Sequence, residues 1–115
     1  MKRYRILYGD KVIGTSNLSG CDESMGVIMG DFVPAPDYEL VRAVFRMFAE
    51  NYDDNDPARY AAYYAARDAL NLRVETEAGA ILPVSTVHVE DFSVEIGEYT
   101  ATVWTDDHSA FESCH

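Results

Sequence analysis

The chain has 115 residues, 48% of them hydrophobic and 25% charged, which is typical of one globular domain with its own core. Nine basic and 20 acidic residues give a net charge of −11, which argues against direct binding to nucleic acid or to an anionic membrane. No apolar stretch approaches the roughly 20 residues of a membrane-spanning helix, and the N-terminus lacks the apolar run of a secretory signal. We therefore expect a cytoplasmic protein with a single domain over residues 1–105 and a flexible tail over residues 106–115.

The first 33 residues predict a hairpin followed by a further strand. Residues 4–8 and 11–15 have the composition of strands, and Gly9-Asp10 between them suits a type II′ turn. Residues 16–24 have the composition of a polar loop. Residues 25–33 predict a strand interrupted by two glycines, a pattern that indicates a bulge or the close approach of another backbone segment.

Two consecutive helices are predicted next. The first covers residues 37–51 and the second residues 57–70, where Asp56 is suited to the N-cap and Pro57 to the first helical position. Helical spacing gives the first helix an apolar stripe: Val41, Val44, Phe45 and Phe48. The second helix has a smaller inward stripe: Ala62, Tyr63, Ala66, Ala69 and Leu70.

The remaining residues predict strands over 72–77, 80–90 and 99–105, with Pro83 indicating an edge or a bulge in the middle one. Because strands and helices are grouped along the chain, the fold class is α+β. We expect a mostly antiparallel sheet of about five to six strands, formed by the N-terminal hairpin, a third strand, a C-terminal hairpin and a final strand. The two helices pack against this sheet.

Motifs for common chemistries are incomplete. The acidic run at 53–56 lacks the later ligands of a calcium loop, and the Gly-containing loop at 19–30 lacks a phosphate-binding pattern. Acidic neighbours disfavour a reactive thiolate at Cys21, and Cys114 lies too far along the chain to suggest a disulfide framework. Asp106, Asp107, His108, Cys114 and His115 match no structural zinc spacing. We predict neither a metal nor a cofactor.

His88 and Glu90 form a candidate polar site. Two residues apart on a predicted strand, they share a face and could begin a metal site or an acid–base pair. A metal needs three or four ligands, and nothing in the sequence places the others. Strand alternation equally predicts a solvated polar face, which is the interpretation we favour.

The second helix carries a candidate interface. Tyrosine and arginine are enriched in protein–protein hot spots, so exposed Tyr60, Tyr64 and Arg67 would favour a partner or a second copy of the chain. Alternatively, the tyrosine rings cover the sheet and keep their hydroxyls in water.

Charge separates two hypotheses about function. Residues 72–115 hold one basic and nine acidic side chains, so a basic protein partner would be attracted to them. The first hypothesis is therefore a non-catalytic protein-binding module, such as a regulator, an inhibitor or an immunity-type protein, that uses this acidic region. Its candidate carboxylates are Glu75, Glu77 and Glu90, and a narrower version, mimicry of a nucleic-acid backbone, would also use Glu95 and Glu98. The alternative is a small-molecule-binding domain or small enzyme with a pocket between helices and sheet near His88 and Glu90.

Overall fold

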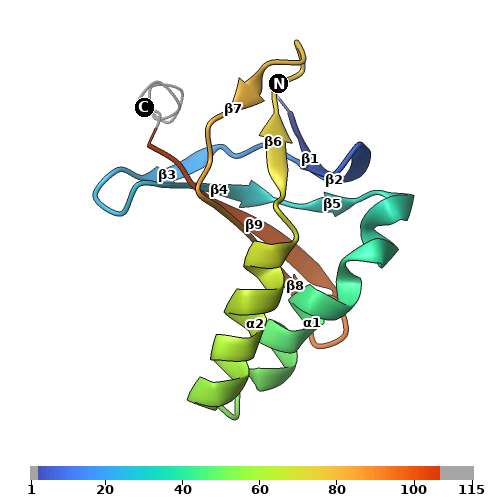
Figure 1. Ribbon diagram of the computed structural model, residues 1–115, viewed down its shortest axis with the longest axis vertical. Helices are drawn as coiled ribbons and strands as arrows, with labels where there is room; N and C mark the ends of the chain where they lie inside the picture. The colour runs from blue at the N-terminus through green and yellow to red at the C-terminus, as the bar shows by residue number, and fades with distance from the viewer. Residues whose placement is uncertain (1–2, 107–115) are drawn as a thin grey trace.

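The computed structural model describes residues 3–106 and has the predicted α+β fold (Figure 1). The tail predicted over residues 106–115 lies outside this range except for Asp106. The strands in chain order are β1 (Tyr4–Tyr8), β2 (Lys11–Ser16), β3 (Gly20–Asp22), β4 (Val27–Asp31), β5 (Val33–Pro34), β6 (Arg73–Glu75), β7 (Ile81–Leu82), β8 (Thr86–Phe92) and β9 (Glu98–Trp104). The helices are the 3₁₀ helix η1 (Pro36–Leu40), α1 (Arg42–Asn51) and α2 (Pro57–Ala69).

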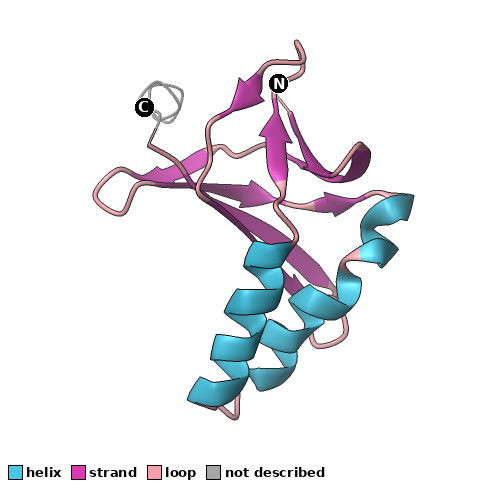
Figure 2. Cartoon of the chain, in the orientation of Figure 1, coloured by secondary structure: helices cyan, strands magenta, loops and turns pink. Residues whose placement is uncertain are grey.

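The strands divide into two antiparallel sheets rather than one. A five-stranded sheet has the order β5-β2-β1-β6-β7, and a four-stranded sheet has the order β3-β4-β9-β8. Figure 2 shows α1 and α2 side by side at one end of the strands. The nine strands of the described residues exceed the five to six that the sequence predicts. Very short strands show little alternation of apolar and polar residues, and alternation does not reveal that one extended run changes sheets.

The chain changes sheets at two points. The predicted strand at 25–33 is broken at Phe32, so that β4 belongs to the four-stranded sheet and β5 to the other. The predicted strand at 80–90 is broken at residues 83–85, between β7 and β8, where Pro83 was expected to disturb the ladder. At the first break the Phe32 ring lies against Gly14, and a Cβ atom at position 14 would also be 2.8 Å from the Val33 carbonyl oxygen. Glycine at position 14 therefore permits the crossing.

The N-terminal hairpin is confirmed, and part of the predicted loop at 16–24 proves to be a strand. Gly9 has φ +62°, the positive value that a type II′ turn requires at its first position. Within the loop, the three residues of β3 pair with β4. Gly30 on β4 allows the close approach expected of a strand glycine, because its Cβ would lie 2.6 Å from the Leu18 amide nitrogen.

Both helices occur where the sequence predicts them, with one break. Val41 separates η1 from α1, so the first helix is not continuous over residues 37–51. The Asp56 side chain caps α2 by accepting a hydrogen bond from the Ala58 amide at 2.9 Å, as predicted. The inward stripe predicted for α2 is wrong at Ala62 and Ala69, which are exposed. α2 therefore lies at the rim of the domain and is anchored by the buried Tyr63.

One core joins both sheets and the helices. Ile6, Ile13 and Val74 come from the five-stranded sheet, whereas Ile28, Val87, Val89, Ala101 and Val103 come from the four-stranded sheet. Tyr38, Val41, Phe45 and Tyr63 complete it from the helical segment, with Tyr38 and Phe45 stacked at 6.4 Å. No helix in the described range is long and apolar enough to cross a membrane.

Candidate functional site

The outer face of the four-stranded sheet carries the candidate site. Antiparallel register aligns His88 on β8 with Thr102 on β9, and Thr102 with Met29 on β4. Because side chains alternate along a strand, these residues lie on the face opposite Val87, Val89 and Val103. One face of this sheet therefore closes the core, while the other is covered at His88 by Phe48 of α1 and Tyr63 of α2.

A cleft of about 390 Å³ lies between α2 and this outer face. Helix α1 contributes Phe48, α2 contributes Tyr64 and Arg67, and the sheet contributes His88, Glu90 and Trp104. Met25 and Met29, both exposed, extend the apolar part of the cleft toward β3 and β4. The cleft thus has aromatic and thioether walls with polar groups on the β8 side.

His88 is buried, with 6% of its surface exposed, so the solvated face that we favoured from strand alternation is wrong for this residue. Its Nδ1 atom is hydrogen-bonded to the Tyr63 hydroxyl, and the Phe48 ring contacts the imidazole edge-on at 4.6 Å. Burial, reinforced by the Arg67 cation, lowers the pKa of His88 to about 4. The imidazole is therefore neutral near pH 7 and fixed in orientation by its neighbours.

Glu90 is the partly exposed acid that neighbours His88 in the cleft. Its Oε1 atom lies 3.9 Å from His88 Nε2, too far for a direct hydrogen bond, and no hydrogen bond to the Glu90 carboxylate occurs within residues 3–106. Over the same residues, no three side chains of the histidine, cysteine or acidic type come together to hold a metal ion. The predicted His88–Glu90 pair therefore exists as two neighbouring polar groups that face one cleft.

The structure joins the two candidate sites that the sequence kept apart. Tyr64 and Arg67, predicted as a partner-binding face of α2, line the same cleft as His88 and Glu90. The Arg67 guanidinium lies over the Tyr64 ring at 5.0 Å and is bonded through Nε to Asp68 at 3.1 Å. Tyr60 stacks beside Tyr64 at 6.3 Å but does not line the cleft.

The predicted acidic region does not form one open face. Glu75 on β6 is bonded to Arg5, and Glu95 after β8 is bonded to Arg46. Glu77, which follows β6, accepts a hydrogen bond from the Arg3 amide at 2.7 Å. These carboxylates therefore lie on or beside strands of two different sheets, and arginine side chains pair with Glu75 and Glu95.

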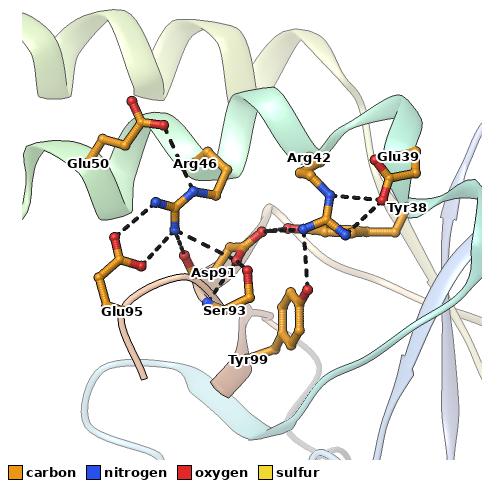
Figure 3. Close-up of polar contacts among 9 residues, drawn as sticks. All are labelled: Tyr38, Glu39, Arg42, Arg46, Glu50, Asp91, Ser93, Glu95 and Tyr99. Atoms are coloured by element: carbon orange, nitrogen blue, oxygen red, sulfur yellow. Dashed lines mark hydrogen bonds and ion pairs between the residues drawn. The ribbon is translucent and has the colours of Figure 1, made fainter. Parts of the chain in front are cut away.

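Sequence reasoning missed a polar network around Asp91 (Figure 3). The Asp91 side chain is fully buried. Its Oδ2 atom accepts a hydrogen bond from the Tyr38 hydroxyl at 2.6 Å, and its Oδ1 atom accepts one from the Ser93 amide at 3.1 Å. Arg42 and Arg46 lie 3.7 Å and 3.8 Å from its two oxygens. All these contacts are internal, so the network fastens the β8–β9 turn to η1 and α1.

The outer part of this network holds the turn itself. Arg46 donates to both carboxylate oxygens of Glu95, at 2.8 Å and 2.9 Å, and to the Asp91 carbonyl. The hydrogen bond from Arg46 lowers the pKa of Glu95, and burial together with the Asp91 contact raises the pKa of Tyr38. No signal in the sequence identifies Asp91, because its partners on η1 and α1 are 45 to 53 positions away.

A second cavity, also of about 390 Å³, lies at the C-terminal end of α2. Its cations are Arg67 and Arg73. Arg67 is bonded to Asp68, and Arg73 donates to the Gly9 carbonyl at 2.5 Å. With both cations engaged, this cavity offers less to a ligand than the cleft at His88.

Comparisons of the chain with models of known protein families, with curated proteins and with solved structures gave no match.

Proposed function

We propose that this chain is a cytoplasmic small-molecule-binding domain and that the cleft between α2 and the four-stranded sheet is its binding site. The proposal rests on one observation, which is that polar side chains from separate elements line the same cleft. His88, Glu90 and Arg67 come from two separate elements and meet aromatic walls in one cavity of about 390 Å³. Mostly apolar walls with a few placed polar groups, in a volume of roughly 300–1,000 Å³, are typical of ligand sites.

The apolar walls favour an occupant. Met25, Met29 and Tyr64 are exposed side chains within the same cleft. Apolar surface gains about 25 cal/mol for each Å² removed from water, so a ligand that covers these side chains gains free energy. Exposed apolar side chains that line one concave place indicate a binding site, whereas an exposed apolar side chain that stands alone does not.

The polar end of the cleft is already ordered. Tyr63 and Phe48 fix the His88 ring, so little side-chain entropy remains to be lost there on binding. Burial raises the pKa of the Tyr63 hydroxyl, which therefore stays protonated. Because the Tyr63 side chain is fully buried, its hydroxyl orients the imidazole and is not accessible to a ligand as a nucleophile.

A ligand screen by NMR tests this proposal on the full chain. Trp104 is the only tryptophan, so its indole N–H signal reports directly on the cleft. We expect binders in a collection of cationic, neutral and anionic small molecules to shift this signal. Thr102→Phe should block binding by filling the cleft, whereas the control Thr100→Phe, on the same face but outside the lining, should not. Absence of binders, or binding that Thr102→Phe leaves intact, would contradict the proposal.

A second candidate function is the protein-binding module, and the β8–β9 turn favours it. Val94 and Ile96 are 76% and 65% exposed at this turn, which Arg46 holds in place through Glu95. Because the turn is anchored, less backbone entropy is lost when these side chains dock on a partner. Nearby Glu98 and the negative C-terminal third would favour a basic partner.

Capture from a native lysate tests the second candidate. We expect the immobilised chain to retain a partner at low salt and lose it at high salt. The double variant Val94→Ser with Ile96→Ser should abolish capture, whereas Val33→Ser, exposed on β5, should retain it. Sedimentation of the free chain would show a homodimer as twice the monomer mass. Capture that is indifferent to the turn variant would remove this candidate.

A further inference from the structure

We propose that the His88 cleft selects a flat aromatic ligand that carries a cationic nitrogen group, and that Glu90 binds this group. The inference rests on the proposed function, since it names the class of ligand for the same cleft. It follows from which charged side chains of the cleft already have polar partners and which do not.

Among the described residues, Glu90 is the acid of the cleft that has neither a hydrogen bond nor a charged partner near pH 7. Its nearest basic group is His88, and burial keeps that imidazole neutral near pH 7. The 3.9 Å contact between Oε1 and Nε2 is therefore not an ion pair under these conditions. With 39% of its side chain exposed, Glu90 remains reachable from the cleft.

The other charged groups of the cleft are engaged. Asp22 accepts hydrogen bonds from the Ser24 hydroxyl at 2.6 Å and the Ser24 amide at 3.1 Å, which hold it in its own turn. Arg67 is bonded to Asp68 and stacked on the Tyr64 ring. Among the described residues, the single cation of the lining is thus already paired, which disfavours an anionic ligand and leaves Glu90 as the charged group available to a ligand.

The aromatic walls support the same preference. Trp104, Tyr64 and Phe48 line the cleft together with Glu90. The negative faces of aromatic rings attract cations, and a flat ring offers them additional stacking area. A ligand with an aromatic body and a cationic nitrogen group would use both parts of the site.

Three probes of nearly the same shape separate charge from shape: benzamidine, benzamide and benzoate, which are cationic, neutral and anionic at pH 7. Titrated into the full chain and followed by Trp104 fluorescence and its indole N–H signal, they should bind in that order. We expect benzamidine to bind about tenfold more tightly than benzamide, as a charge-assisted hydrogen bond to a carboxylate would give. Benzoate should bind most weakly.

Two matched variants test the role of Glu90. Glu90→Gln and Glu98→Gln each remove one negative charge, but only Glu90 lines the cleft. Glu90→Gln should abolish the advantage of benzamidine over benzamide, and Glu98→Gln should preserve it. Both variants must retain the wild-type NMR spectrum away from the substituted residue, which shows that they fold.

Each other outcome overturns the inference. Equal affinity for the three probes, tighter binding of benzoate, an advantage of benzamidine that survives Glu90→Gln, or no binding of benzamidine would each exclude the proposed class. The proposed function has a separate test. If benzamide, benzoate or another compound of the collection shifts the Trp104 signal and Thr102→Phe blocks it, the cleft binds ligands although the cationic class is wrong. If no compound does so, the proposed function itself fails.

Discussion

Strand β8 carries two buried polar side chains, His88 and Asp91, and they have opposite surroundings. Asp91 faces the core, where a hydroxyl, a backbone amide and two arginines contact its carboxylate. His88 faces outward and is covered by Phe48 and Tyr63. Its Nδ1 atom has a partner within the protein, whereas its Nε2 atom points toward Glu90 and the cleft.

The difference teaches where stability and binding reside in this domain. A buried charge with internal partners on all sides stabilises one arrangement of the chain and offers nothing to a ligand. A buried imidazole ring with one nitrogen facing a cavity stabilises the fold less, but it offers an ordered polar group to a ligand. We therefore expect substitutions around Asp91 to affect mainly folding, and substitutions on the cleft side of His88 to affect mainly binding.

The largest expected effect is that of Asp91→Ala. It leaves the Tyr38 hydroxyl and part of two guanidinium groups without their buried acceptor, which typically costs about 3–5 kcal/mol. Urea denaturation measures the free energy of unfolding. The control Asp37→Ala, an exposed carboxylate in η1, should leave it nearly unchanged. A loss below about 1 kcal/mol would mean that Asp91 is not the centre of the closed network.

The pH dependence of stability isolates His88. Its pKa falls from 6.5 in the unfolded chain to about 4 in the folded protein, so the unfolded state binds the extra proton between these values. Stability is thus fully present above pH 6.5 and declines as the pH falls toward 4. At about 1.4 kcal/mol per tenfold change in proton affinity, the loss reaches roughly 3 kcal/mol.

Urea denaturation of the wild type and of His88→Gln across this pH range checks the prediction. The variant should lose less stability on acidification, because it has no imidazole to protonate. Acidic side chains and the remaining histidines, His108 and His115, are common to both proteins, so the difference between the two curves belongs to position 88. Parallel curves would contradict a buried, neutral His88.

Removal of one hydroxyl has a smaller effect. Tyr63→Phe keeps the ring packed between Phe45 and Phe48 but leaves the buried Nδ1 atom of His88 without its partner. An unsatisfied buried polar atom costs about 1–3 kcal/mol, so thermal and urea unfolding should both show destabilisation. Tyr60→Phe serves as the control, since Tyr60 is only partly buried and makes no hydroxyl hydrogen bond within residues 3–106. Equal stability of the two variants would argue against the Tyr63–His88 bond.

Local features were predictable from the sequence, and contacts between distant segments were not. Gly9 at a turn and Asp56 before Pro57 act on their immediate neighbours, and both predictions are confirmed. Alternation correctly placed His88 on the outer face of β8. It could not show that Phe48 and Tyr63 cover that face, since their helices reach it through tertiary packing.

The change of sheet and the Asp91 network illustrate the same limit. The sequence pattern of residues 25–33 indicates an extended backbone but not which strand each part pairs with. The break at Phe32 could therefore not be predicted from the sequence. Asp91 looked like one more acid in an acidic region. Its role depends on Tyr38, Arg42 and Arg46, which precede it by 45 to 53 positions.

The smallest expected effect on stability gives the sharpest contrast between the two regions. Glu90 and Glu95 are equally exposed, at 39% and 38% of their side chains, yet Glu90 faces the cleft and Glu95 accepts two hydrogen bonds from Arg46. Glu95→Gln should lower the urea midpoint, because the amide cannot receive both guanidinium bonds as a carboxylate does. Glu90→Gln should leave the midpoint unchanged, because neutral His88 is its nearest partner at 3.9 Å. If Glu90→Gln proved the more destabilising of the two, Glu90 would belong to the fold rather than to the cleft, and its assignment as the group that binds the ligand would lose its basis.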